Sequence, residues 1–386
     1  MVLYGVPKCV SERISGFSSL SHHQKELVAE YVTGLLAADS KSALGISKGV
    51  VGSHYKSLER LLTDYPFSCE ALDTDRLLLL ESNNETRSSS KHGSLIVDDT
   101  SIEKQMPYAY KYYDHAEHRF KKGLVLVSLA YADHKTSYPV DVERYVPKHI
   151  DPEGFKTKIE IAIELIEGSC HLVRFRFVIF DSWYLCEDMH TYVRGIGKHW
   201  ISRVKSDRLV LYQGRYIPVR EYAKLKKSKA KTVTGKLVYA SDVKLKSIRD
   251  RVKLVVVYEE EETIFLASSL VSLKAEGVLH HYSNRFLIEV FHKDAKQHLG
   301  LADWKVRPVE GAKRHWHLLM LAYTLLRLDV ASDQLTRNIS SMEKSVSKNL
   351  RLYGFLALME LVWLATGKAC PMLVAEFLRN GGIGMG

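Results

Sequence analysis

The sequence predicts an α/β fold in which a mixed β-sheet is covered by helices, with a helical region before the sheet and another after it. Short apolar runs typical of strands alternate with segments of helical periodicity between residues 94 and 205. A polar, serine-rich linker at residues 82–93 separates them from an N-terminal part with helical apolar spacing. The predicted domains are 1–92 (helical), 93–205 (first part of the core), 206–262 (β-rich insertion), 263–332 (second part of the core) and 333–386 (helical tail).

Composition favours a soluble, cytoplasmic protein that binds a polyanion. The 386 residues are 46% apolar and 26% charged, and the net charge is +10. No segment approaches the ~20 apolar residues that span a bilayer, and the N-terminus lacks the pattern of a secretory signal. The five cysteines form no CxxC pair, so neither a disulfide framework nor a zinc knuckle is predicted.

The N-terminal domain, 1–92, has two segments of helical spacing, 22–38 and 53–66. We expect Gly45 and Gly49 to break the helical pattern between them, which would give two helices around a turn. Such a pair can read DNA as a helix-turn-helix. Residues 1–94 hold 10 lysines and arginines against 11 acids, however, so a plain helical packing domain is the alternative.

The core elements follow in the order β-β-β-α-β-α-β. Strands are predicted at 94–99, 123–132, 136–146, 174–180 and 199–205, and helices at 155–168 and 188–197. Pro139 cannot donate a ladder hydrogen bond, which places the third strand near an edge of the sheet. A further strand at 263–269 and a strongly apolar helix at 311–332 complete the core.

The insertion, 206–262, is predicted to contain short strands separated by lysine-rich turns. Residues 202–253 hold 16 lysines and arginines against four acids, and no acid occurs between residues 222 and 241. A surface that follows DNA phosphates is the preferred interpretation, and a solvated lysine-rich loop is the alternative. The lysines concerned are Lys224, Lys226, Lys227, Lys229, Lys231 and Lys236.

Acidic residues end two of the apolar runs. Asp98 and Asp99 follow LIV, and Asp181 follows FVIF, although an aspartate there could also cap a helix. Because alternate residues of a strand face opposite sides, only one of Asp98 and Asp99 is expected to point into a shared site. Cleavage of a phosphodiester needs such acids, since two divalent ions about 3.5–4 Å apart activate the nucleophile and stabilise the leaving oxygen. Magnesium prefers hard oxygen ligands.

A third acid lies in the run Tyr282-x2-Arg285-x3-Glu289-x6-Lys296. If one helix carries this run, the four side chains fall within roughly 60° of one another. A carboxylate flanked by cations suits a metal ion beside phosphates, so the residues favour a metal-dependent enzyme that cuts and joins DNA. The histidines indicate a zinc site only weakly. No Walker loop or Gly-x-Gly-x-x-Gly motif indicates a nucleotide cofactor.

These residues resemble the DDE transposases with an RNase H-like core, in the cut-and-paste insertion-sequence branch marked by the Tyr-x2-Arg-x3-Glu-x6-Lys signature. The similarity covers about residues 94–330. It implies that Asp99, Asp181 and Glu289 are catalytic and hold two Mg²⁺ (or Mn²⁺) ions, with Asp98 as the alternative first ligand. It also implies that Arg285, Lys293 and Lys296 hold phosphates near the transposon end, and that Tyr282 positions DNA or a neighbouring side chain.

The resemblance further implies a transposase that binds the terminal inverted repeats of a mobile element as a homodimer, nicks double-stranded DNA and joins it to target DNA. The protein would be cytoplasmic and associated with a prokaryotic nucleoid. Trp183 and Trp304 could stack on an unpaired base, or pack in the interior. The alternatives are an RNase H-like nuclease or resolvase without strand transfer and an inactive DNA-binding derivative. The inverted-repeat sequence, the region that reads it and the reaction intermediate stay open.

Overall fold

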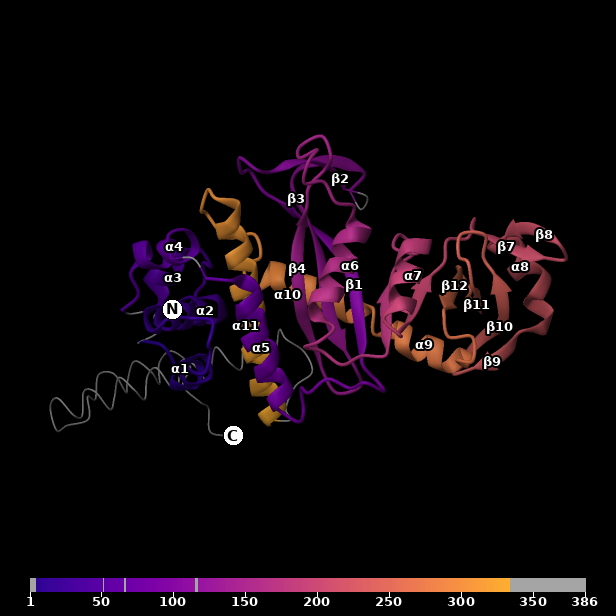
Figure 1. Cartoon of the computed structure of the whole chain (residues 1–386), viewed down its shortest axis with the longest axis horizontal. Helices are drawn as coiled ribbons and strands as arrows, with labels where there is room; N and C mark the ends of the chain where they lie inside the picture. Colours follow the sequence, from indigo (N-terminus) through magenta and orange to yellow (C-terminus); the bar gives the residue numbers. More distant parts are fainter. Residues whose placement is uncertain (1–4, 51, 66, 115–116, 334–386) are drawn as a thin grey trace. The chain divides into compact units, whose positions relative to one another are not determined.

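A computed structural model describes residues 5–333 of the chain, except 51, 66 and 115–116, and places them in two compact units (Figure 1). The first unit combines residues up to Leu80 with the chain from Lys293 onward, and the second runs from Glu81 to His292. The predicted C-terminal helical region, from residue 334 onward, lies outside the described residues.

The first unit is helical, as the sequence predicts for its N-terminal part. Ser21 begins the longest N-terminal helix with a capping box, in which it exchanges hydrogen bonds with Gln24. The helices assigned to this unit, wholly or in large part, are α1 (Lys8–Ser15), α2 (His22–Ala37), α3 (Ala43–Gly49), α4 (Tyr55–Thr63), α5 (Cys69–Ser82) and α11 (Val309–Asp333).

The prediction that Gly45 and Gly49 break the helical pattern is wrong, because both lie within α3. The Ser42 hydroxyl accepts a hydrogen bond from the Gly45 N–H at 3.2 Å and caps the helix. A Cβ atom at Gly45 would lie 2.4 Å from the backbone oxygen of Ser40, so glycine allows a close approach rather than a turn. The two predicted helices correspond to α2 and α4, and α3 lies between them in the chain.

The second unit is built on one large mixed sheet, in the order β2-β3-β1-β5-β6-β12-β11-β10-β9. Strands β1, β5 and β6 are parallel to one another, and the other neighbours are antiparallel. The strands are β1 (Ser94–Glu103), β2 (Tyr110–Asp114), β3 (Arg119–Ala132), β4 (Ser137–Tyr145), β5 (Phe177–Phe180), β6 (His199–Arg203), β7 (Leu209–Tyr212), β8 (Arg215–Pro218), β9 (Lys231–Val233), β10 (Lys236–Lys244), β11 (Arg251–Tyr258) and β12 (Thr263–Ser268).

This mixed sheet with flanking helices confirms the predicted α/β class and is consistent with an RNase H-like fold. Strand β4, which contains Pro139, pairs only with β3, as expected of an edge strand. Strand β1 continues through Glu103, so Asp98 and Asp99 lie within it and not at its end. The helices are α6 (Lys158–Ser169), α7 (Glu187–Gly195), α8 (Val219–Lys226), the 3₁₀ helix η1 (Lys227–Lys229), α9 (Ala275–Ser283) and α10 (Phe286–Gln297), which runs on into the first unit.

The basic insertion, 206–262, does not form a sheet separate from the core, as the prediction of an insertion would suggest. Strands β9, β10 and β11 continue the large sheet beyond β12, while β7 and β8 form a small sheet of their own. The segment expected to be a lysine-rich turn contains α8 and η1. Val219, Tyr222 and Ala223 are buried at helical spacing, which explains why this segment folds as a helix.

Alternation along the central strands assigns each residue to one of two faces. Ile96, Phe177 and Ile179 pack in one apolar cluster with Val278 of α9 and Ile288 of α10. Helix α6 contacts β3 and β4 (Figure 1). Among the described residues, every helix is too short or too polar to cross a lipid bilayer.

His281 of α9 should make the stability of this core depend on pH. Its ring lies 4.4 Å from the ring of Phe177, and burial lowers its pKa to about 4, helped by His280 and Arg176. The unfolded chain binds this proton near pH 6.5, so stability is complete above that pH and falls as the pH drops toward 4. The loss from this group should be on the order of 1 kcal/mol near pH 5, because solvent screens part of the effect.

Urea unfolding of the wild type and of His281→Leu at several pH values measures this term. The difference between their unfolding free energies should shrink or reverse as the pH falls, because the variant has no proton to gain at this position. Parallel pH profiles for the two proteins would refute the assignment.

Candidate active site

Asp98 and Asp181 are brought together by the register of two parallel strands. Ser94 of β1 pairs with Phe177 of β5, and the pairing continues without a shift to Val97 and Phe180. Asp98 and Asp181 each directly follow the last pair of this register, and the charge of Asp181 acts on Asp98. Because Ile96 and Ile179 face α9 and α10, the acids two residues further on face the same side.

Arg285 connects this pair of strands with Glu289. One nitrogen of its guanidinium lies 3.4 Å from Asp98 Oδ2, and the other donates to Glu289 Oε1. A single side chain thus spans the acid of β1 and the acid of α10. The Tyr282 ring packs beside it, with its centroid 6.0 Å from the guanidinium carbon.

The charge balance at Asp98 favours a further cation. Burial, with smaller contributions from the charges of Asp99 and Asp181, raises the pKa of Asp98 to about 7, despite the lowering effect of the Asp99 N–H and of Arg285. A carboxylate in such surroundings is expensive to ionise unless positive charge is supplied. Asp98, Asp181 and Glu289 offer carboxylate oxygens, the type of ligand that a divalent Mg²⁺ or Mn²⁺ ion prefers.

Asp99, the acid predicted as the first metal ligand, faces the other side of β1. Its Oδ2 accepts from Lys158 Nζ at 2.7 Å, and its Oδ1 accepts from the Tyr184 hydroxyl at 3.2 Å. Both carboxylate oxygens of Asp99 therefore accept hydrogen bonds, one from Lys158 of α6 and one from Tyr184 in the segment after β5. Its own N–H donates to Asp98 Oδ1 at 2.9 Å, so this arrangement holds the adjacent acid in place.

The signature run is not one continuous helix, and in that respect the prediction is wrong. Tyr282 lies in α9, Asn284 and Arg285 form a turn, and Glu289 lies in α10. Hydrogen bonds from Asn284 N–H to His281 O and from Arg285 N–H to Tyr282 O span three residues, which tightens and ends α9. Serine and asparagine at 283–284 favour helix ends over helix interiors.

Lys293 and Lys296 are exposed on α10, at offsets of four and seven from Glu289. These offsets keep the three side chains on one side of the helix. Of the four residues predicted to share one helix face, only Glu289 and Lys296 lie on the same helix, α10, whereas Tyr282 lies in α9 and Arg285 in the turn between them.

The two tryptophans proposed for base stacking differ in exposure. Trp183 is 47% exposed; its backbone N–H donates to Asp181 Oδ1 at 2.8 Å, and its ring lies beside Lys158, whose Nζ is 5.3 Å from the ring centroid. Trp304 is 1% exposed and packs edge-on against Trp316 at 5.5 Å. Interior packing is therefore the role of Trp304, and a DNA-stacking role for it is wrong.

The lysines of the insertion lie on α8, η1, β9 and the start of β10. Lys224, Lys227, Lys229 and Lys231 are exposed. Lys226 is half-buried, with its Nζ 4.4 Å from the centroid of the Tyr212 ring. Exposed Lys236 pairs with Glu259 at 2.6 Å. Most of the lysines predicted to bind DNA are therefore accessible to a polyanion, while the Lys226 side chain also packs against Tyr212.

Replacing Lys224, Lys227 and Lys229 by alanine should weaken DNA binding and reduce its salt dependence. Each phosphate contact that is lost removes about 0.9 from the slope of log K against log salt, so a fall of two to three is expected if all three engage DNA. Fluorescence anisotropy with labelled duplex at several salt concentrations measures this slope.

The matched control replaces three exposed lysines elsewhere, Lys8, Lys91 and Lys135. Equal slopes for the two triple variants would remove α8 and η1 from the DNA interface.

Sequence reasoning missed Lys158 and Tyr184, which bind Asp99. Tyr184 follows Asp181 by three residues, so its nearness in the sequence could have marked it as a candidate site residue. Lys158 begins α6, 59 residues from Asp99, and nothing in its local pattern separates it from the other lysines.

Comparison with known proteins gave one family match. A family model described as "DDE superfamily endonuclease" matches residues 17–234, which is more than half of the chain. The matched segment contains Asp98, Asp99 and Asp181 but ends before Glu289. The search of curated proteins found no match.

Proposed function

Because the chain belongs to the DDE superfamily of endonucleases, we propose that it is a transposase of the cut-and-paste insertion-sequence branch with the Tyr-x2-Arg-x3-Glu-x6-Lys signature. The family assignment implies a nuclease-type enzyme that acts on DNA and uses a divalent metal. The proposal adds binding of terminal inverted repeats, strand transfer and action as a homodimer on paired ends.

The observation that carries the proposal is the register that sets Asp98 beside Asp181 on the face covered by α9 and α10. Arg285 links the same acid to Glu289. We therefore propose Asp98, Asp181 and Glu289 as the metal-binding acids, with Asp98 taking the place first given to Asp99.

The three acids would hold two Mg²⁺ or Mn²⁺ ions, which supply an activated water and stabilise the leaving oxygen. Arg285, Lys293 and Lys296 provide cations for the phosphates that flank the scissile bond. Lys158 and Tyr184 fix Asp99, whose N–H in turn orients Asp98. Trp183 offers a stacking surface for an unpaired base beside Asp181.

The second candidate is a nuclease or resolvase that cleaves without joining, and the third is an inactive DNA-binding derivative. The purified protein is incubated with DNA that flanks its gene, with Mg²⁺ and with a target plasmid. Cleavage at specific ends together with joined product supports the transposase. Cleavage without joined product supports the nuclease, and binding with no cleavage supports the inactive derivative.

Asp181→Asn and Glu289→Gln are the controls, since both should bind DNA and fail to cut it. Cleavage that survives in both variants would show that the nuclease activity arises elsewhere.

A further inference from the structure

The segment between β5 and α7, residues 181–186, carries three side chains of the candidate site and is called the Asp181 loop below. Asp181 begins it, and its Oδ1 accepts from the Trp183 N–H at 2.8 Å, which closes a tight turn. The Tyr184 hydroxyl donates to Asp99 at 3.2 Å. The conformation of this loop therefore decides where the Asp181 carboxylate lies.

The far end of the Asp181 loop is held by the basic insertion. The Arg208 guanidinium donates to the carbonyl oxygen of Leu185 at 2.8 Å, and Leu185 is 1% exposed, so the arginine takes the place of water at this carbonyl. The Arg208 carbonyl oxygen in turn accepts from the N–H of Val219, the first residue of α8, at 2.8 Å. Arg208 therefore connects the lysine-bearing helix α8 with the loop.

The turn between β10 and β11 holds the first part of α7. The Glu187 carboxylate, at the start of α7, accepts from the Arg249 N–H at 2.7 Å. The Trp200 indole N–H, which can only donate, donates to His190 Nδ1 at 3.0 Å. The Nε2 atom of the neutral His190 ring therefore carries the proton and donates to Asp250 Oδ2, at 3.1 Å. The helix that follows the Asp181 loop is thus bonded to the insertion at two points.

We propose that Arg208 and Asp250 are positioning residues for DNA cleavage, because they fix the Asp181 loop and the start of α7 and so the place of the Asp181 carboxylate. The inference rests on the proposed function in that Asp181 is taken as a metal-binding acid. It gives the insertion a role beyond contact with DNA through its lysines. Magnesium demands near-ideal ligand geometry, and a displacement of about 1 Å can lower a rate about a hundredfold.

Hydrogen exchange followed by mass spectrometry measures the order of the loop in the full-length protein, without metal or DNA. Arg208→Ala should speed exchange in peptides that cover residues 182–190 on the order of tenfold, since the Leu185 carbonyl loses its donor. Arg208→Lys can still donate and should restore most of the protection. The matched control is Arg251→Ala, because the Arg251 guanidinium also donates to a backbone carbonyl of the insertion, that of Asp242, at 3.2 Å.

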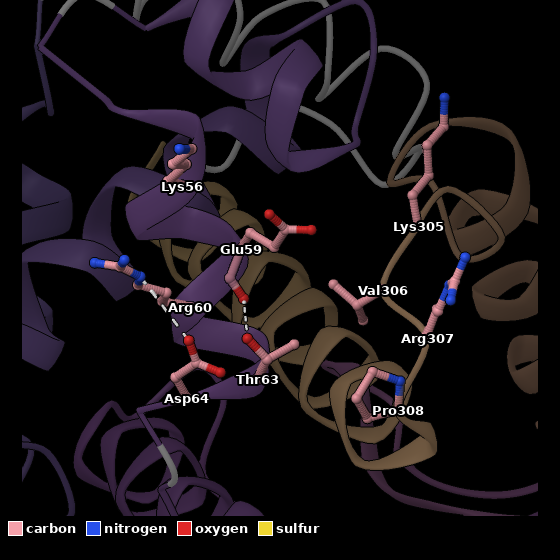
Figure 2. A pocket seen from close by; sticks show the side chains of 9 residues that line it. All are labelled: Lys56, Glu59, Arg60, Thr63, Asp64, Lys305, Val306, Arg307 and Pro308. Carbon is pink, nitrogen blue, oxygen red and sulfur yellow. Dashed lines mark hydrogen bonds and ion pairs between the residues drawn. The ribbon is translucent and has the colours of Figure 1, made fainter.

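Single-turnover cleavage at saturating DNA in Mg²⁺ is the second readout. Arg208→Ala and Asp250→Ala change the charge in opposite directions, yet each should lower the rate about tenfold to a hundredfold with little change in DNA affinity. Asp250→Asn keeps an acceptor for His190 and should retain most of the activity. A second control, Arg60→Ala, removes an arginine that pairs with Asp64 at 3.9 Å on α4 (Figure 2), and it should change neither readout.

Unchanged exchange at residues 182–190 in Arg208→Ala would overturn the proposal, and so would cleavage rates in Arg208→Ala and Asp250→Ala that equal those of the two controls. Circular dichroism checks folding, and Asp250→Ala, a change at a half-exposed side chain, carries the test if Arg208→Ala does not fold. Faster local exchange in a protein that never cleaves DNA would contradict the proposed function and leave the positioning of the loop supported. Unchanged exchange in a protein that cleaves DNA would contradict this inference alone.

Discussion

Asp98→Asn should lower the rate of DNA cleavage by at least about a thousandfold, whereas Asp99→Asn should lower it by less than about tenfold. The two acids are neighbours in sequence, yet the pleat of β1 turns them to opposite faces. Asparagine at 98 keeps the shape of the side chain and removes the charge that a divalent ion requires. Single-turnover cleavage of an end-containing duplex in Mg²⁺ measures both rates.

Asp99→Asn has a different expected cost, which is structural. Lys158 would lose its ion pair and Tyr184 would keep only a neutral acceptor, so the free energy of unfolding should fall by about 1 kcal/mol. Thermal unfolding of the two variants separates this effect from the loss of activity. If Asp99→Asn proves the more damaging to cleavage at equal stability, the first ligand is Asp99 and the register argument fails.

The sequence alone could not decide whether Asp98 or Asp99 lies on the same face of the sheet as Asp181. The runs LIVD and VIFD both place an aspartate after three apolar residues, and side by side they would have indicated Asp98 as the counterpart of Asp181. That alignment holds only if the two strands are parallel neighbours with no shift, which is a tertiary fact. Periodicity predicted the strands, but pairing and register decided which acid of β1 faces α9 and α10.

The helical elements show a similar limit. The apolar spacing at 22–38 predicted α2 well, because many buried positions repeat along one helix. Short elements depended on single contacts instead: the Ser42 cap that begins α3, and the turn at Asn284 that separates α9 from α10. The packing of α11 on α4 joins residues about 250 positions apart, since Arg314 donates to the carbonyl oxygen of Leu62, and no local pattern could have indicated it.

Removing the Arg285 guanidinium should have opposite effects on metal binding and on catalysis. In the free protein this cation is bonded to both Asp98 and Glu289, so it competes with a metal ion for the same carboxylates. Arg285→Ala should therefore bind Mn²⁺ several-fold more tightly in the absence of DNA, by about 1 kcal/mol. Cleavage should fall about a hundredfold, because a phosphate contact that stabilises the transition state is lost.

Calorimetric titration with Mn²⁺ at several pH values above 7 measures the first effect. Because Arg285 lowers the pKa of Asp98, the variant loses this proton at a higher pH, and the two proteins are compared where the measured affinity no longer rises with pH. Lys293→Ala is the control, because it removes a cation from α10 that bonds neither acid in the described contacts and should leave Mn²⁺ binding unchanged. Weaker binding in Arg285→Ala would mean that the arginine holds the two acids at a useful separation. Tighter binding with slower cleavage would mean that the arginine leaves the carboxylates when metal and DNA arrive, and that its charge then serves the phosphate.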